Sequence, residues 1–148
     1  MTHNLITVGW REWVLLPELQ LPPIQAKVDT GAKTSCLHAF SVEPFMKGEK
    51  EWVRFGMHPH QKDTQTEMFC EAMVTDQREV TDSGGHKEER YVITTQLVIA
   101  DQQWPIEMTL TNRDTMRFRM LLGREAMEQH IIVDPSASYL LDEPTNSN

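Results

Sequence analysis

The residues with the clearest potential for chemistry are Asp29, Thr30 and Gly31, which follow the short apolar stretch that ends in Val28. A glycine two positions after an aspartate allows the chain a backbone conformation that other residues resist. The threonine hydroxyl between them can hydrogen bond to backbone groups and fix the loop. An aspartate displayed in this way suits general acid–base chemistry, although an Asp-x-Gly tripeptide by itself is most often an ordinary turn.

The elements that must hold this loop have mostly the short, alternating apolar patterns of β-strands. A strand is predicted at residues 24–28, directly before Asp29, and another at 35–45, closed by Pro44. One short helix is predicted in REAMEQH after Gly123, and a last strand, interrupted at Pro135, in IIVDPSASYLL. Many short strands at close spacing with one helix predict an all-β fold, most economically a closed barrel.

Length and composition indicate one domain over residues 1–148, with a polar tail from about residue 142. The formal net charge of −8 argues against a nucleic-acid partner, because phosphate binding requires clustered lysines and arginines. No apolar run is long enough to span a membrane. The two cysteines, Cys36 and Cys70, suit a reducing compartment, so we expect a cytoplasmic location.

Several blocks of sequence together resemble one known family. VDTGA after an apolar strand is similar to the active-site loop of retropepsin-like aspartic peptidases, and FRMLLGREAM is similar to the segment that completes the same barrel. With GWREWVLLPEL and VDPSASYLL, these blocks extend from Gly9 to Leu141. They resemble the bacterial retropepsin-like family often labelled ATP-dependent zinc proteases.

The resemblance implies a closed, six-stranded-type acid-protease barrel with one short helix near the C-terminus. It also implies an aspartic endopeptidase that hydrolyses peptide bonds with a pair of aspartates sharing one proton. Asp29 is then one half of the catalytic pair, Thr30 fixes the loop, and Gly31 and Ala32 shape it. The second aspartate comes from another copy of the chain, so the expected partners are a second subunit and a peptide or protein substrate.

The segment TDSGG offers a second Asp-x-Gly tripeptide at Asp82. Its flanking residues are polar, without the buried strand that would hold a catalytic loop. The resemblance favours a different role, in which the segment is the flap hairpin that covers substrate and Gly84 and Gly85 form its tip.

Two features of the loop region are left open by the sequence. Arg124, which follows the apolar-Gly segment, either braces a carboxylate across the subunit interface, as the resemblance suggests, or makes an ordinary surface salt bridge. Lys33 stands where the retroviral enzymes usually carry an acidic residue. The role of the long segment 43–76 is also open.

The family label mentions zinc and ATP, and the sequence lacks the common motifs for both. There is no His-Glu-x-x-His motif and no Gly-rich loop ending in Gly-Lys-Ser/Thr. Cys36 with His38, and His58 with His60, are spaced to share a strand face, but they are equally typical of a small buried residue and a solvent loop. We predict no metal and no cofactor. The alternatives are a catalytically silent peptide-binding module on the same fold and a zinc-dependent hydrolase.

Overall fold

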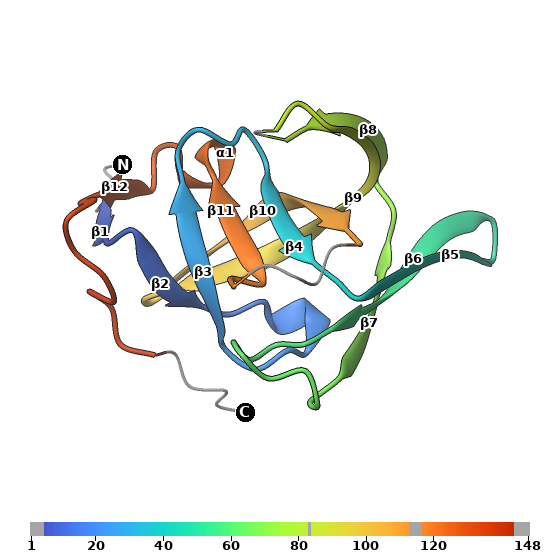
Figure 1. Cartoon of the computed structure of the whole chain (residues 1–148), viewed down its shortest axis with the longest axis horizontal. Coiled ribbons are helices and arrows are strands. Elements are labelled where there is room, and N and C mark those ends of the chain that lie inside the picture. Colours follow the sequence, from blue (N-terminus) through green and yellow to red (C-terminus); the bar gives the residue numbers. More distant parts are fainter. Residues whose placement is uncertain (1–4, 83, 113–116, 144–148) are drawn as a thin grey trace.

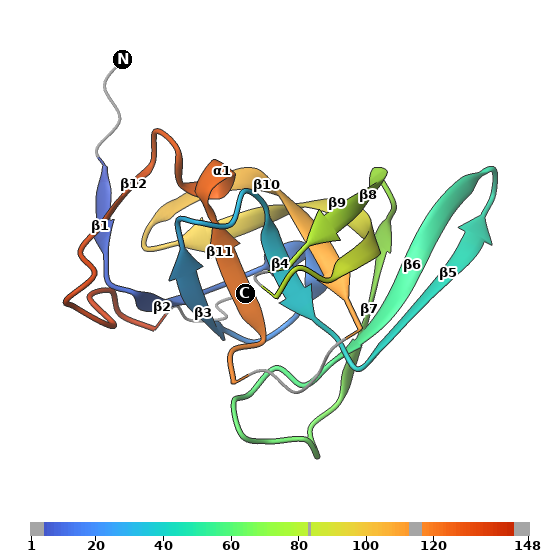
Figure 2. The same ribbon diagram turned by 45° about the horizontal axis from the view of Figure 1, so that its top comes forward.

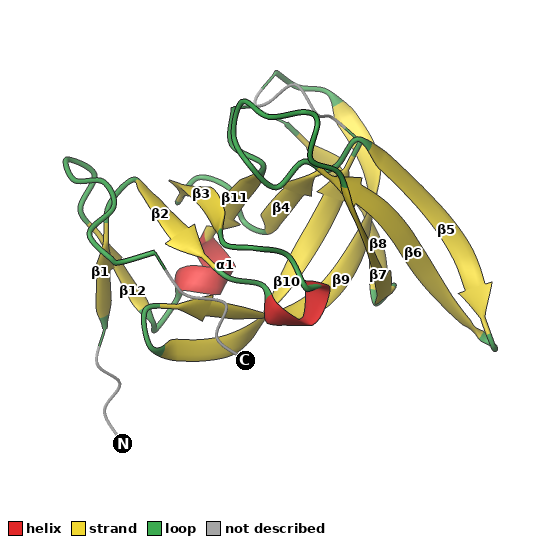
Figure 3. Cartoon of the chain, turned by 90° about the horizontal axis from the view of Figure 1, so that it is seen from below, coloured by secondary structure: helices red, strands yellow, loops and turns green. Residues whose placement is uncertain are grey.

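The computed structural model describes residues 5–82, 84–112 and 117–143 and is built mostly of strands (Figures 1 and 3). No helix in these ranges is long and apolar enough to cross a membrane. The elements are β1 (Ile6–Val8), β2 (Arg11–Val14), the 3-10 helix η1 (Pro17–Leu19), β3 (Ile24–Asp29), β4 (Ser35–His38), β5 (Ser41–Lys47), β6 (Lys50–Met57), β7 (Met68–Met73), β8 (Asp76–Thr81), β9 (Lys87–Ile99), β10 (Gln102–Thr111), β11 (Met120–Gly123), α1 (Arg124–Met127) and β12 (Ile131–Val133).

The largest sheet has the strand order β2-β3-β11-β4-β10-β9-β8, and its central strands lie side by side in Figure 1. β11 runs parallel to β3, and their register pairs Gly123 with Asp29. β4 runs antiparallel to β11 on its other side. The ends of β3 and β11 therefore meet at one edge of the sheet, although they are far apart in the sequence.

The prediction of a mostly-β fold with one short helix near the C-terminus is confirmed. The finer prediction of a closed six-stranded barrel is not confirmed, because β2 and β8 are the two end strands of the large sheet and do not pair with each other. The sheet does curve back on itself at one point, where Leu15 and Val98 exchange backbone hydrogen bonds of 3.0 and 2.8 Å.

One face of the large sheet covers the hydrophobic core. Along β3, Ile24 and Ala26 are buried in the core, whereas Lys27 between Ala26 and Val28 is exposed on the other face. The same alternation places Met120 and Leu122 of β11 in the core. Each fully buried large aliphatic side chain contributes about 1.5–3 kcal/mol to stability. This face therefore holds the sheet together and leaves the opposite face available for a site.

Two strand predictions were wrong in extent. The single strand predicted at 35–45 is two strands, β4 and β5, which belong to different sheets. β5 continues through Pro44, which pairs with Val53, instead of ending there. β5 is an edge strand of the sheet β5-β6-β7, where a proline that lacks a backbone N–H can be tolerated. The predicted last strand is limited to Ile131–Val133, which pairs in parallel with β1. Residues 134–143 form no strand, and the helix covers only Arg124–Met127.

The segment whose role was open, 43–76, forms most of the sheet β5-β6-β7, and the β5–β6 hairpin projects from the body (Figure 2). Cations cover two of its aromatic rings: Lys47 Nζ lies 4.3 Å from the centre of the Trp52 ring, and the Arg54 guanidinium lies 4.2 Å from that of Phe69. Such contacts stabilise exposed aromatic rings by about 0.5–1 kcal/mol.

A buried carboxylate fastens the C-terminal segment onto β2. Glu12 is fully buried. Its Oε2 accepts hydrogen bonds from the backbone N–H groups of Gly9 and Leu140, both at 2.8 Å, and its Oε1 accepts one from Leu141 at 3.2 Å. A buried charge is stable only when hydrogen bonds replace its hydration. Glu12 is therefore a structural link between β2 and the segment before residue 142.

Candidate active site

The Asp29 loop lies at the exposed end of β3. Asp29 is half-buried, and its Oδ1 accepts a hydrogen bond of 3.0 Å from the Gly31 N–H. The Ala32 N–H donates to the Asp29 carbonyl oxygen at 3.2 Å, which closes the turn. Thr30 is exposed and takes part through its carbonyl oxygen, without a hydroxyl hydrogen bond among the described residues. The carboxylate is thus oriented by the loop's own backbone.

The start of α1 packs against this loop. The Arg124 N–H donates to the Ala32 carbonyl oxygen at 2.7 Å, and the Glu125 N–H donates to that of Lys33 at 3.0 Å. The Gly123 N–H donates to Ser35 Oγ at 2.9 Å. These bonds fix the loop to the end of β11 and the start of α1. A functional site needs such support to keep its reacting group in place.

Gly123 is the position at which this packing tolerates no side chain. A Cβ there would lie 2.6 Å from the Thr34 carbonyl carbon and 2.8 Å from the Ser35 nitrogen, both backbone atoms. We expect Gly123→Ala to lower the free energy of unfolding by about 1–3 kcal/mol, the usual range for overpacking. Chemical denaturation of both proteins measures this change, and a loss below about 0.5 kcal/mol would contradict the packing described.

Arg124 lies on the surface of the single chain. Its Nη1 donates a hydrogen bond of 3.1 Å to the Thr30 carbonyl oxygen, so it holds the loop within its own chain. No carboxylate pairs with it among the residues that the structure describes. Its role as a brace across a subunit interface stays a prediction.

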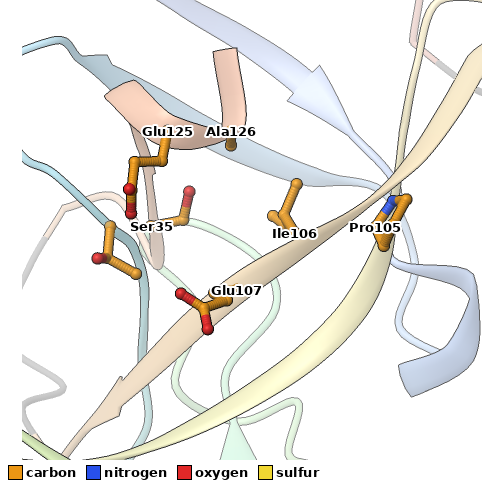
Figure 4. Close-up of a pocket in the computed structure, with 7 residues that line it drawn as sticks. Ser35, Pro105, Ile106, Glu107, Glu125 and Ala126 are labelled. Carbon is orange, nitrogen blue, oxygen red and sulfur yellow. The ribbon is translucent and has the colours of Figure 1, made fainter. Parts of the chain in front are cut away.

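A cavity of about 1000 Å³ lies against the loop. Its lining includes Asp29, Gly31 and Ala32 from the loop, Leu121 from β11, and Asp82 and Gly84 from the turn between β8 and β9. A smaller cavity of about 250 Å³ adjoins it beside α1, and Glu107 and Glu125 line both (Figure 4). The structure therefore brings the two Asp-x-Gly segments to one cavity.

The second of these segments forms a hairpin turn. β8 and β9 are antiparallel partners, and Gly85 has a positive φ of 84°. Asp82 Oδ1 accepts hydrogen bonds from the N–H groups of Gly84 and His86, both at 2.9 Å. Ser83 lies outside the described residues. The Asp82 carboxylate is engaged in holding the turn, an arrangement that suits the predicted flap better than a second catalytic loop.

The hairpin is fastened to the sheet by Arg78. Its two Nη atoms donate to the two carboxylate oxygens of Glu107 at 2.9 and 2.8 Å, and its Nε donates to Asp76 at 2.6 Å. The Arg78 hydrogen bond, with one from the Gln77 backbone, holds the pKa of the Asp76 carboxyl below its usual range. Asp76 therefore stays ionised, and this clamp stays charged, to a lower pH than for an ordinary aspartate.

A buried polar network in the cavity wall was not predicted. Arg90 Nε donates to Glu88 Oε1 at 2.6 Å, and Thr111 Oγ1 donates to the same oxygen at 2.7 Å. Arg90 Nη1 contacts Cys36 Sγ at 3.4 Å. The sequence signal for this network was Arg90, a charged residue at the start of the apolar stretch RYVITTQLVIA. The pairing of β9, β10 and β4 brings these side chains together.

The two zinc-type pairs do not combine into a ligand set. His58 is buried, and its ring Nδ1 lies 3.2 Å from the Thr66 carbonyl oxygen, whereas His60 is exposed. Cys70, which belongs to neither pair, is buried among apolar residues, and this burial raises the pKa of its thiol to about 12. Within the described ranges no group of three or more His, Cys, Asp and Glu residues could hold a metal ion.

Comparison with known proteins gives matches of three kinds. The family model described as "Retropepsin-like aspartic endopeptidase RimB" matches residues 7–144. Two proteins named "Probable alpha-L-glutamate ligase" match over 143 residues, 97% of this chain: one from Parasynechococcus marenigrum at 50% identity and one from Shewanella pealeana at 44%. The crystal structure of Lpg0085, a protein of unknown function from Legionella pneumophila, is similar with a TM-score of 0.76 and 25% identity, over 93% of this chain and 98% of that one.

The relatives differ from this chain in size. The chain spans only 30% of the Parasynechococcus protein and 31% of the Shewanella protein. Their ligase name describes the whole proteins, of which this chain resembles less than a third. The family model and the relatives named above do not carry the zinc-protease label that the sequence resemblance suggested.

Proposed function

Because the chain belongs to the RimB-like family of retropepsin-like aspartic endopeptidases, we propose that it hydrolyses peptide bonds with Asp29 as its catalytic acid and base. One observation carries the proposal: a backbone-oriented carboxylate and a Gly-tipped hairpin face the same cavity of about 1000 Å³. That arrangement supplies a reacting group and a cover for an extended peptide.

The chemistry requires two such carboxylates. With a single proton shared between two close aspartates, the ionised one takes a proton from water while the protonated one donates to the carbonyl oxygen of the scissile bond. The attacking water adds to the carbonyl carbon, and the proton it loses is returned to the leaving amine as the C–N bond breaks. No covalent enzyme intermediate is formed.

The second carboxylate is proposed to come from Asp29 of another copy. Within the described part of the chain, the Asp29 carboxylate accepts a hydrogen bond from the Gly31 N–H, and the Asp82 carboxylate holds its own turn. A two-fold axis that passes between two Asp29 loops would place the two carboxylates side by side and give one shared cleft.

Activity should therefore depend on the concentration of the protein. We expect the rate per chain to fall on dilution, with the same midpoint as the monomer–dimer equilibrium, because a separated chain holds only half of the reacting pair. Peptide hydrolysis over a dilution series, beside analytical ultracentrifugation, measures both. A rate per chain that stays constant down to a fully monomeric sample would contradict the shared site.

The relatives suggest a substrate class. In proteins named alpha-L-glutamate ligase, a domain similar to this chain shares one polypeptide with the rest of the protein, which keeps it at high effective concentration near the product. From that name we infer a product that contains α-linked glutamate. We propose that the substrate is a peptide segment with α-linked glutamate residues.

The test compares poly-α-L-glutamate with poly-γ-glutamate and poly-L-lysine as substrates, with release of new amino groups as the readout. Cleavage confined to the α-linked polymer supports this substrate class. Equal cleavage of the lysine polymer would contradict it. Binding of the α-linked polymer without any cleavage would favour the alternative of a catalytically silent peptide-binding module.

A further inference from the structure

The side of β3 that carries Asp29 also carries a pair of cations. Lys27 precedes Asp29 by two positions in the same strand, so the two side chains lie on one face, about 7 Å apart along the strand. Arg11 of β2 is the direct cross-strand partner of Lys27. Both residues lie on the face of the sheet opposite the core.

This face continues into the cavity. The register of the sheet makes one row of neighbours across it: Lys27 pairs with Leu121, and Leu121 pairs with Cys36. Leu121 and Cys36 line the cavity beside Asp29. A peptide that occupied the cavity and extended over Leu121 would reach Lys27 and then Arg11.

The two cations are not compensated by the protein. Within the ranges that the structure describes, Lys27, Arg11 and the nearby Lys33 form no salt bridge, although the chain has a net charge of −8. Like charges placed directly opposite on neighbouring strands destabilise a sheet. An uncompensated pair beside a reacting carboxylate is therefore typical of a site that is completed by an anionic ligand.

Arg11 is held ready for such a ligand. Its guanidinium lies 4.6 Å from the centre of the Trp10 ring and 4.8 Å from that of Tyr139. Stacking between two rings fixes the plane of a guanidinium. The Arg11 Nε is buried and has no hydrogen-bond partner among the described residues, so the guanidinium retains N–H groups that can donate to a carboxylate.

Apart from Asp29, the carboxylates that line the cavity lie outside β2 and β3, and most of them are paired with a cation or accept hydrogen bonds. Glu107 is paired with Arg78, Glu79 lies 3.9 Å from Lys87 Nζ, and Asp82 holds the hairpin turn. Glu125 of α1 lines both cavities. The positive charges of Lys27 and Arg11 thus lie on the β2–β3 side of Asp29, whereas the carboxylates lie on the hairpin, β10 and α1.

We propose that Lys27 and Arg11 form a subsite that binds the carboxylate side chain of an acidic peptide substrate next to the scissile bond. This inference rests on the proposed function and assigns the residues that determine its specificity. Lys27, nearer to Asp29, contacts the acidic residue next to the bond that is cleaved, and Arg11 contacts the one beyond it.

The test uses two fluorogenic peptides that differ only by glutamate or glutamine at the positions flanking the cleavage site. We expect Lys27→Met to lower kcat/KM for the glutamate peptide about tenfold, with little change for the glutamine peptide. Lys27→Glu should reverse the preference. Lys50→Met is the matched control, because Lys50 is an exposed lysine in the distant β6. A glutamate-to-glutamine ratio unchanged in Lys27→Met would overturn the subsite.

A binding experiment keeps the two proposals separate. In the Asp29→Asn background, fluorescence anisotropy measures the affinity for both labelled peptides without turnover. Tighter binding of the glutamate peptide that is lost in Lys27→Met and retained in Lys50→Met supports the subsite even if no peptide is cleaved by the unmodified protein. Equal affinity for both peptides would overturn the subsite, whether or not the peptidase proposal holds.

Discussion

Replacing Asp29 by asparagine is expected to lower the rate of peptide hydrolysis by about 100- to 10,000-fold, the range over which a positioned acid or base contributes. Asparagine has nearly the same shape, and its side-chain oxygen can still accept the hydrogen bond from the Gly31 N–H, so the loop should keep its conformation. It cannot accept a proton from water. The measurement is kcat/KM for one peptide substrate, with circular dichroism to confirm that both proteins are folded.

Two control variants make this result specific. Asp101→Asn changes an exposed aspartate in the turn between β9 and β10 and should leave the rate unchanged. Asp82→Asn removes a carboxylate from the same cavity and should weaken the hairpin turn, with a much smaller loss than Asp29→Asn. If Asp82→Asn were as inactive as Asp29→Asn in a protein that is active as a monomer, the catalytic pair would be internal and the shared site wrong.

Replacing Glu12 by alanine is expected to lower the free energy of unfolding by about 3–5 kcal/mol. Three backbone N–H groups lose their acceptor, and each buried donor left without a partner costs about 1–3 kcal/mol. Water entering as the C-terminal segment moves away offsets part of this loss. Glu12→Gln keeps one acceptor oxygen and should lose about half as much. Urea denaturation followed by tryptophan fluorescence measures both.

Glu49 provides the matched control, since it is an exposed glutamate at the tip of the β5–β6 hairpin. Glu49→Ala should change stability by less than about 0.5 kcal/mol, as for most surface substitutions. A loss below about 1 kcal/mol for Glu12→Ala would show that the segment around Leu140 is not held by this carboxylate.

The sequence was most informative where a feature depends on adjacent residues. The strand before Asp29 and the short helix after Gly123 follow from local apolar patterns. The special backbone conformation expected at Gly31 is not found: among the described glycines, Gly48 and Gly85 have a positive φ, whereas Gly31 contributes its N–H to the Asp29 carboxylate. The flap position of Gly84 and Gly85 came from the family resemblance, and the structure places both in a hairpin turn, with Gly84 at the same cavity as Asp29.

Predictions were poorer where an element depends on its neighbours in the sheet. Pro44 predicts the end of a strand, but it is tolerated within β5 because β5 is an edge strand, a property that no local pattern reveals. In β2, Glu12 is buried while its neighbours Arg11 and Trp13 are only partly buried. Nothing in the local sequence indicates that the glutamate is the buried residue. Its burial is stabilised by Leu140 and Leu141, more than a hundred residues away.

By itself, the sequence determined that a carboxylate ends an apolar strand in a mostly-β chain, because strand alternation and glycine turns are local properties. Only the tertiary structure decided what surrounds that carboxylate. The parallel pairing of β3 with β11 brings Gly123 to Asp29, and the register of β2 on β3 sets Arg11 opposite Lys27. Long-range register is selected by which side chains the whole sheet can bury together, and a shift of one residue would turn every one of them to the other face.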